Sequence, residues 1–273
     1  MDNRPIGFLD SGLGGISVLG EALRMLPQEN FLYYGDTKHI PYGDKPPEVV
    51  FQYVHDAIDR LVTLGCKAIV IACNTATSVA AGQLRQELKL PIIGMEPALK
   101  PASLMEGEGK VLVMATRVTL ALPKFQLLME RYGKDAIPLP CPGLMECVEA
   151  GELDGARVES VLEQLLKPYQ NEPIKAVVLG CTHYPFLKKA IARFFPSNVV
   201  LVDGNAGTVR QLGRRLAEEN LCAKGPGGQV TFLSSLEGPE PLERMQHMLT
   251  LWRTQSAACE EQPRIAADIE GCK

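Results

Sequence analysis

Short apolar runs recur along the chain, and they constrain its fold more than any other feature. They are rich in Val, Ile and Leu without polar alternation, and they cover residues 6–10, 31–35, 68–73, 91–95, 110–115, 176–181 and 198–203. Such runs are typical of strands buried on both faces of a parallel sheet. The segments between them have helical period, as in 46–64, where Gly65 follows as a stop. The sequence therefore predicts an α/β fold with βαβ crossovers.

Two breaks in this pattern predict a division into domains. Residues 94–110 contain two prolines and three glycines, and residues 203–207 read DGNAG. After the second break the pattern predicts a helix and one more strand, at 229–235. A chain of 273 residues with 46% hydrophobic content is long enough for two cores. We therefore expect one α/β domain at 1–97 plus 207–255, a second at 98–206, and a tail at 256–273.

Two of the predicted strands are similar to each other and end in the same way. KAIVIAC ends at Cys73 and KAVVLGC at Cys181, and hydroxyl or amide side chains follow both. A second correspondence places Asp10 and Ser11 after the first strand of one half and Thr116 after the first strand of the other. We therefore expect two pseudo-symmetric α/β domains with parallel sheets and an active site in the cleft between them.

The placement of the two cysteines indicates acid–base chemistry. In open parallel sheets, ligands bind at the carboxyl ends of strands, where helix N-termini favour a thiolate. Two thiols on opposite sides of a bound molecule can remove a proton from a carbon and return one to its other face, which inverts a stereocentre. Buried packing cysteines are the plain alternative for each stretch alone. A redox pair would instead need the two thiols within disulfide reach.

Polar groups at other strand ends indicate an amino acid as the substrate. Asp10, in LDSGLGG (9–15), suits an ammonium group, and the glycine-rich backbone suits a carboxylate. This loop matches neither the dinucleotide nor the P-loop pattern. Further candidate donors are Ser11, Asn74, Thr75, Thr116, Thr119 and Thr182, and Tyr42 with Gly43 lies in a loop able to fold over the site. Each also has an ordinary role as a helix cap or turn residue.

Charge and composition argue against several classes of function. A net charge of −4 provides no basic field for nucleic acid. No run approaches a transmembrane helix, and the chain start does not resemble a signal peptide, so we expect a cytoplasmic protein without a membrane partner. The eight cysteines are expected to be free thiols. No metal site is expected, because Cys and His lack metal-ligand spacing, and two positioned thiols make a cofactor unnecessary.

Five motifs resemble, in order, those of the glutamate racemases of the aspartate/glutamate racemase superfamily. They are LDSGLGG (9–15), YYGDTKHIPYG (33–43), ACNTAT (72–77), CPGLMECVE (141–149) and LGCTHYP (179–185). The resemblance, which extends from Asp10 to about Leu251, implies two α/β domains with the site between them. It also implies cofactor-independent interconversion of L- and D-glutamate, which supplies D-glutamate for peptidoglycan and thus for cell-wall biogenesis and cell shape. Family members often form homodimers.

The resemblance implies roles for individual residues. Cys73 would take the proton from D-glutamate and Cys181 from L-glutamate. Asp10 would assist Cys73, and His183 with Glu149 would assist Cys181. Substrate contacts would fall on Asp10, Ser11, Tyr42, Gly43, Asn74, Thr75, Thr116, Thr119, Thr182 and His183.

The sequence departs from the family pattern at several positions and leaves alternatives open. His39 stands where an arginine is frequent, and Glu146 competes with Glu149 for the role of assisting acid. His183 has a structural role as its alternative. An aspartate racemase, another two-cysteine member of the superfamily, and a non-catalytic amino-acid-binding protein are the other interpretations of the whole chain.

Overall fold

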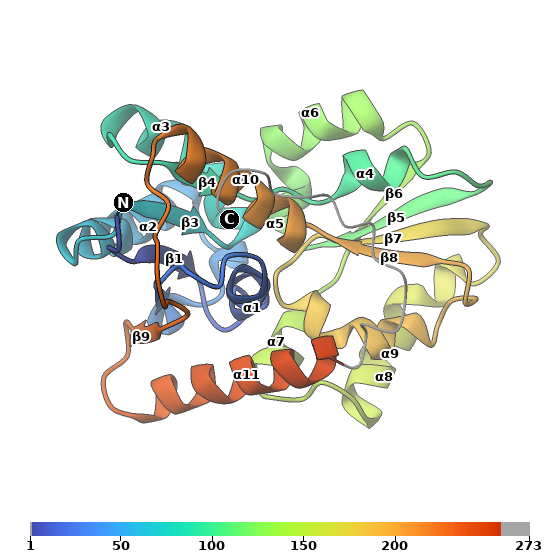
Figure 1. Ribbon diagram of the computed structural model, residues 1–273. Coiled ribbons are helices and arrows are strands. Elements are labelled where there is room, and N and C mark those ends of the chain that lie inside the picture. The colour runs from blue at the N-terminus through green and yellow to red at the C-terminus, as the bar shows by residue number, and fades with distance from the viewer. Residues whose placement is uncertain (1, 258–273) are drawn as a thin grey trace. The chain divides into compact units, whose positions relative to one another are not determined.

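Within residues 2–257, which the computed structural model describes, the paired strands run parallel and form two sheets (Figure 1). Unit 1 comprises the chain up to Gly94 and from Asn205 onward, and unit 2 comprises Met95–Gly204. The parallel sheets confirm the predicted α/β class. The tail predicted at 256–273 lies outside the described residues from residue 258 onward.

Unit 1 is built on a sheet with the strand order β4-β3-β1-β2-β9. Its strands are β1 (Ile6–Asp10), β2 (Phe31–Gly35), β3 (Ala68–Ile71), β4 (Ile92–Gly94) and β9 (Val230–Ser234). Its α-helices are α1 (Ile16–Met25), α2 (Pro47–Thr63), α3 (Asn74–Glu87), α10 (Asn205–Glu218) and α11 (Glu240–Ala257). Two short 3-10 helices, Thr37–His39 and Tyr42–Asp44, lie in the connection between β2 and α2.

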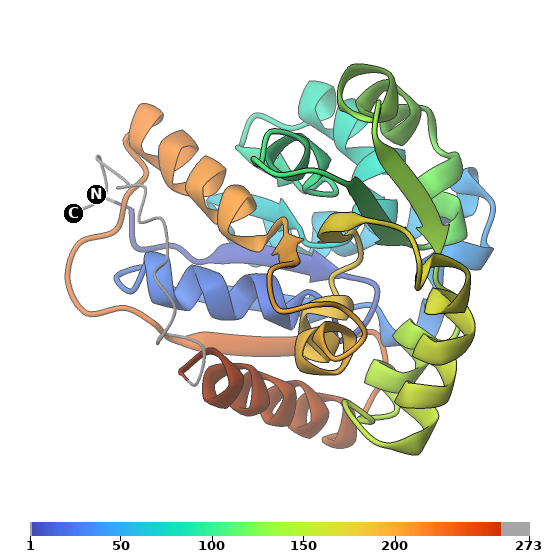
Figure 2. The same ribbon diagram turned by 90° about the vertical axis from the view of Figure 1, so that its right-hand side faces the viewer.

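Helices cover both faces of this sheet. Apolar residues of α2 and α3, including Val54, Ile58 and Leu84, pack in one cluster with Leu9 and Ile71 of the sheet. α1 lies between α10 and α11 in the other helical layer (Figure 2). Because side chains on both faces of the central strands are buried, these strands read as continuous apolar runs in the sequence.

Unit 2 is built on a sheet with the strand order β6-β5-β7-β8. Its strands are β5 (Lys110–Ala115), β6 (Ala136–Pro140), β7 (Ile174–Leu179) and β8 (Val200–Asp203). Its α-helices are α4 (Leu99–Ser103), α5 (Arg117–Ala121), α6 (Pro123–Tyr132), α7 (Leu144–Glu149), α8 (Ala156–Leu166) and α9 (Lys188–Ala192). Short 3-10 helices span Lys167–Tyr169 and Tyr184–Leu187.

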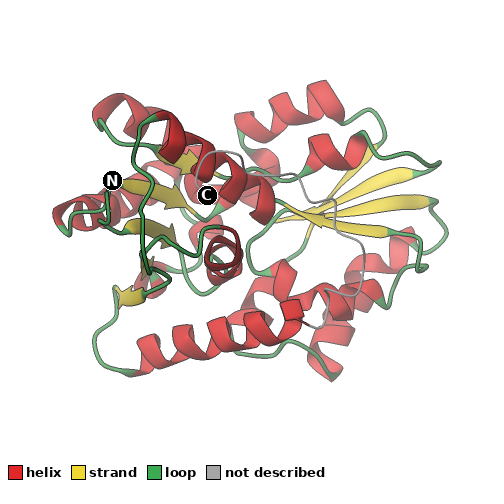
Figure 3. Cartoon of the chain, in the orientation of Figure 1, coloured by secondary structure: helices red, strands yellow, loops and turns green. Residues whose placement is uncertain are grey.

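The sheet of unit 2 also lies between two helical layers (Figure 3). α4 and α6 lie on one side, where Leu99 and Phe125 pack against Val111 and Val178, and α7, α8 and α9 lie on the other. Sequence analysis did not predict β6. Its sequence, AIPLP, contains two prolines, which lack a backbone donor, and the strand lies at the edge of the sheet, where prolines are tolerated.

The two sheets share one topology, which confirms the predicted pseudo-symmetry. The order β4-β3-β1-β2 in unit 1 corresponds strand for strand to β8-β7-β5-β6 in unit 2. β9 is an addition to unit 1, paired with β2. β3 and β7, which lead to the two cysteines, therefore occupy equivalent places, each beside the first strand of its unit.

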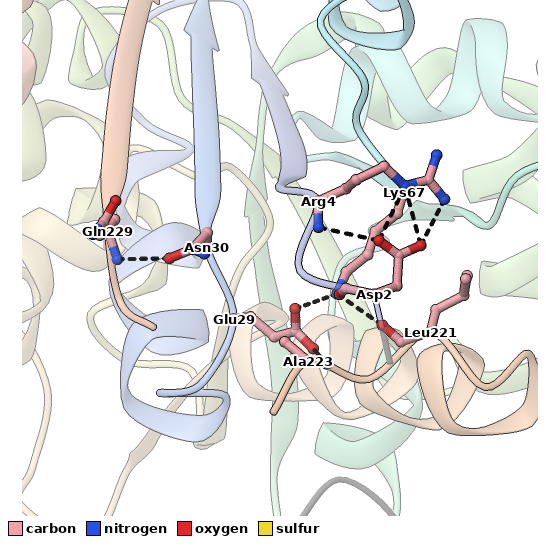
Figure 4. A network of polar contacts seen from close by, with 8 residues as sticks. All are labelled: Asp2, Arg4, Glu29, Asn30, Lys67, Leu221, Ala223 and Gln229. Carbon is pink, nitrogen blue, oxygen red and sulfur yellow. Dashed lines mark hydrogen bonds and ion pairs between the residues drawn. The ribbon is translucent and has the colours of Figure 1, made fainter. Parts of the chain in front are cut away.

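A buried polar network joins the two stretches of chain that make up unit 1 (Figure 4). The ammonium group of Lys67 forms an ion pair with Glu29 at 2.6 Å and donates to the carbonyl oxygens of Asp2 and Leu221. The other Glu29 oxygen accepts the N–H of Ala223 at 2.8 Å. A charged pair buried this deeply is tolerated because hydrogen bonds satisfy it.

The cysteines follow the sequence-based expectation with one exception. Cys66, Cys73, Cys141, Cys147 and Cys181 are free thiols. Cys222 is disulfide-bonded, so the expectation of free thiols is wrong at this position. It follows α10 in a partly buried segment.

Candidate active site

Cys73 lies at the carboxyl end of β3 and caps α3. Its sulfur accepts the N–H of Ala76 at 3.5 Å, and the Ser11 hydroxyl lies 3.9 Å from the sulfur. The thiol is buried, with 7% of the residue exposed. The cysteine thus occupies the position usually taken by Ser, Thr, Asp or Asn, where free N–H groups and the helix dipole favour negative charge.

Asp10 and Ser11 lie beside Cys73 because β1 and β3 are neighbours. The pairing of Leu9 with Ile71 continues into a hydrogen bond from the Ala72 N–H to the Leu9 carbonyl at 2.7 Å. Asp10 is fully buried, and one carboxylate oxygen accepts the Gly12 N–H at 2.8 Å.

Gly15 allows the start of α1 to approach Asp10 closely. A Cβ at Gly15 would lie 2.7 Å from the Cβ of Asp10, nearer than real Cβ contacts come. The glycine-rich stretch that follows Asp10 is therefore explained by close packing around the carboxylate rather than by a phosphate loop.

Asn74 and Thr75 begin α3 directly after the thiol, and both are buried. Within the described residues, the buried Oδ1 of Asn74 has no hydrogen-bond partner. A buried polar atom without a partner costs free energy, so this oxygen is an acceptor suited to a bound polar molecule.

Tyr42 and Gly43 lie in the connection between β2 and α2, and Tyr42 is buried. The Tyr42 hydroxyl donates to a carboxylate oxygen of Asp36 at 2.6 Å. Burial, together with the neighbouring Asp36 carboxylate, raises the pKa of Tyr42, so its phenol stays protonated and remains a donor.

Cys181 lies at the carboxyl end of β7 in unit 2, in the place equivalent to that of Cys73. β7 pairs with β5, and the Gly180 N–H donates to the Met114 carbonyl at 2.7 Å. The helix that follows Cys181 is the 3-10 helix Tyr184–Leu187 and not an α-helix. Pro185 lies in this short turn, and α9 begins only at Lys188.

His183 contacts the Cys181 thiol and connects it to Glu149. Its Nδ1 lies 3.5 Å from the Cys181 sulfur, and its Nε2 lies 2.7 Å from a carboxylate oxygen of Glu149, the last residue of α7. Glu146, the competing acid, lies in the first turn of α7 and is exposed. Of these two acids, Glu149 is the one that contacts His183.

The charge of His183 is set by these two partners. Burial alone would lower the pKa of its imidazole, but the hydrogen bonds and charges of Cys181 and Glu149 outweigh burial and hold the pKa well above its ordinary value. The imidazolium form donates from both ring nitrogens, one toward the sulfur and one toward the carboxylate. A donor that can carry positive charge thus lies beside the Cys181 sulfur.

The threonines predicted for unit 2 lie at the same edge of its sheet as Cys181. Thr116 follows β5 and caps α5, accepting the Thr119 N–H at 3.2 Å, and its hydroxyl donates to that of Thr119 at 2.9 Å. Thr182 is buried beside Cys181. In unit 1, Asp10, Ser11, Asn74 and Thr75 gather around Cys73, and in unit 2 Thr182, His183 and Glu149 gather around Cys181.

Sequence analysis missed two residues that border these groups. Asp36 is the partner of Tyr42, and the buried Tyr184 donates to the Cys141 carbonyl at 3.2 Å, which joins the segment after Cys181 to the segment after β6. Both lie inside the quoted motifs YYGDTKHIPYG and LGCTHYP. The sequence signal was present, but the contacts depend on the fold.

Two further properties of the described residues, 2–257, bear on the class of protein. No group of three or more His, Cys, Asp or Glu side chains there is arranged to hold a metal ion. None of the helices there has both the length and the apolar character that crossing a membrane requires.

Comparison with known proteins defines the class. Residues 37–212 match the model of the Asp/Glu/Hydantoin racemase family, and the chain belongs to this family of isomerases. A glutamate racemase of Clostridium perfringens is 49% identical over 255 residues, which cover 92% of this chain and 98% of the relative. This relationship places the chain among the glutamate racemases of the family.

Solved structures of the same group share the fold. The glutamate racemase of Escherichia coli, in complex with L-glutamate and the activator UDP-MurNAc-ala, superposes with a TM-score of 0.81 at 28% identity and covers 91% of this chain and 95% of its own. The glutamate racemase of Francisella tularensis, in complex with D-glutamate, superposes with a TM-score of 0.78 at 28% identity. The match covers 92% of this chain and 95% of that one.

Proposed function

We propose that this chain interconverts L- and D-glutamate without a cofactor, through one thiol from each unit. The observation that carries the proposal is the equivalence of Cys73 and Cys181. Both follow corresponding strands of two sheets with the same topology. Each sulfur has a polar neighbour, the Ala76 N–H for Cys73 and the His183 imidazole for Cys181. The similarity to glutamate racemases solved with L- or D-glutamate supports glutamate as the substrate.

In the proposed mechanism, one cysteine is the base and the other is the acid. Starting from D-glutamate, the Cys73 thiolate takes the α-proton and the electron pair of the C–H bond stays on the substrate. The Cys181 thiol then gives its proton to the opposite face of the α-carbon, which produces L-glutamate and leaves Cys181 as thiolate. From L-glutamate the two roles exchange.

The neighbouring residues tune the two thiols in this mechanism. Asp10 and Ser11 lie on the Cys73 side, where Ser11 contacts the sulfur directly. On the Cys181 side, the His183 imidazolium stabilises the thiolate by charge, and Glu149 stabilises the imidazolium in turn.

Substrate contacts are proposed for polar groups near each thiol. Asn74, Thr75, Tyr42 and Gly43 join Asp10 and Ser11 in unit 1, and Thr116, Thr119, Thr182 and His183 serve in unit 2. The buried Asn74 Oδ1 supports this assignment, since it is an acceptor that a substrate ammonium group can satisfy.

Supply of D-glutamate for peptidoglycan, and so a place in cell-wall biogenesis, is proposed from the same family relationship. A cytoplasmic location is proposed from the family relationship as well. The homodimer expected from the family stays a prediction, which sedimentation velocity can test.

Incubation in deuterated water tests the proposed reaction. Purified protein, without added cofactor, is given L-glutamate, D-glutamate, L-aspartate or D-aspartate. We expect optical activity to decay to zero from either enantiomer of glutamate, with deuterium incorporated at the α-carbon. Exchange with aspartate alone would assign the other substrate of the superfamily, and no exchange with either amino acid would refute the racemase assignment and favour a binding protein.

A further inference from the structure

The connection between β2 and α2 contains a buried carboxylate with two donors from the same loop. Asp36 is 2% exposed, and its N–H donates to the Asp10 carbonyl at 2.9 Å. Its carboxylate accepts the Tyr42 hydroxyl at 2.6 Å, and the His39 Nδ1 lies 2.9 Å and 3.0 Å from its two oxygens. Asp36 thus joins the loop that carries Tyr42 and Gly43 to the backbone of Asp10.

His39 also attaches this loop to α2. Its ring stacks on that of Tyr53, with centroids 3.9 Å apart and an angle of 11° between the planes. The Tyr42 ring also lies against Tyr53, with the two ring centroids 6.3 Å apart. Tyr53 is held by α2, so the stack fixes the orientation of the imidazole and directs Nδ1 toward Asp36.

The contact between His39 and Asp36 matters because the Asp36 carboxylate is buried. A buried carboxylate needs donors to offset its lost hydration, and here the loop supplies two of them. The pKa of Tyr42 is raised by burial and by Asp36, so its phenol remains a neutral donor. His39 is the other side chain of this loop within hydrogen-bond distance of the carboxylate, and it faces both oxygens.

We infer that His39 is a positioning residue that holds Tyr42 and Gly43 in place for the substrate, acting through Asp36 and Tyr53. This inference rests on the proposed function, since it takes these two residues as substrate contacts. His39 does not itself touch the reacting atoms. Its loss frees the loop and weakens substrate binding, while both thiols stay in place.

Replacement of His39 by leucine tests the inference. His39→Leu removes the donor and the flat ring, and we expect KM for glutamate to rise about tenfold in both directions, the effect of one lost hydrogen bond to a charged group. We expect kcat to stay close to that of the wild type and the melting temperature to fall modestly, because Asp36 loses one donor but keeps the Tyr42 hydroxyl. His39→Arg should restore KM, because a planar guanidinium can both donate to Asp36 and stack on Tyr53.

His55→Leu is the matched control. His55 lies in α2, its side chain is 34% exposed against 30% for His39, and it also pairs with carboxylates, those of Asp59 and Glu87. Its replacement should leave KM unchanged. The inference is overturned if His39→Leu leaves KM unchanged, if kcat and stability fall together with no change in KM, or if His39→Arg fails to restore KM. A wild-type protein inactive on glutamate refutes the proposed function itself, which separates the two failures.

Discussion

The surroundings of Cys73 and Cys181 differ although their places in the two sheets are equivalent. Cys73 accepts the Ala76 N–H at the start of α3, whereas Cys181 precedes a 3-10 helix and contacts the His183 imidazole. A helix N-terminus supplies fixed partial charge, while an imidazolium supplies a full charge that depends on pH. One topology thus places two physically different partners beside the two sulfurs.

The comparison predicts that both thiols are equally necessary for the reaction. It also predicts that different neighbouring groups control their protonation. The Ala76 N–H beside Cys73 is fixed by the fold of α3, which single side-chain changes alter little. The surroundings of Cys181 depend on His183 and Glu149, side chains from separate elements of unit 2. Mutations should therefore reveal the difference between the two sites.

Loss of either thiol should have the largest effect. Cys73→Ser and Cys181→Ser keep the shape of the side chain, but a hydroxyl is a far weaker acid than a thiol. We expect each to reduce kcat for glutamate by at least about 10³-fold, as expected when an acid–base residue is lost. The measurement is the decay of circular dichroism from each enantiomer, and wild-type turnover in either variant would contradict the two-base mechanism.

Lys67, directly before β3, and Lys175, near the start of β7, should differ strongly in their effect on stability. Lys67→Met leaves Glu29 buried without its cation, so we expect a loss of about 3–5 kcal/mol in the free energy of unfolding. The equivalent Lys175 donates to the Met105 carbonyl at 2.9 Å, and Lys175→Met should cost about 1 kcal/mol. Urea unfolding of the two variants measures the difference, and equal losses would show that the Glu29 pair contributes no special stability.

His183→Asn should slow one proton transfer more than the other. Because the equilibrium constant of a racemisation is one, kcat/KM must fall equally in both directions, and we expect a fall of about 10²-fold. The asymmetry should appear with α-deuterated substrates: the isotope effect should grow from L-glutamate, whose proton Cys181 takes, and not from D-glutamate. Ser11→Ala, on the Cys73 side, serves as the comparison, and a growth of the isotope effect from D-glutamate instead would reverse the assignment of the thiols.

The pH dependence of stability should show the smallest effect. The pKa of His183 is raised in the folded protein by Cys181 and Glu149, which outweigh burial, so protonation stabilises the fold. This contribution is complete below the ordinary histidine pKa of about 6.5 and is lost as the pH rises through the raised value. The melting temperature of the wild type relative to His183→Asn should therefore fall as the pH rises above about 6.5, and a difference that grows with pH would have the wrong sign.

The sequence predicted much of this comparison because its strands are buried on both faces. Continuous apolar runs ending in Cys73 and Cys181 placed both thiols at the carboxyl ends of parallel strands, and the structure has them there. It also predicted the helix start after Cys73, because Asn74 and Thr75 are typical of such positions. It did not predict β6, since AIPLP contains two prolines and resembles a loop.

The contacts that distinguish the two sites could not be derived from local pattern. His183 and Glu149 are 34 positions apart, and they meet because α7 and the turn after β7 lie at the same edge of the unit 2 sheet. The choice between Glu149 and Glu146 was likewise open, although both lie in the same helix. The structure decides it, because Glu149 at the end of α7 reaches the imidazole, whereas Glu146 in the first turn is exposed.

The sequence by itself determined the fold class, the repeated topology and the two cysteine positions, because periodicity and strand-end residues are local properties. The tertiary structure alone decided that a helix N-terminus supports Cys73 while a histidine–glutamate pair supports Cys181. It also decided that Asp36 holds His39 and Tyr42 together. Burial, charge and hydrogen-bond geometry depend on which distant segments pack together, and that is settled only when the whole chain is folded.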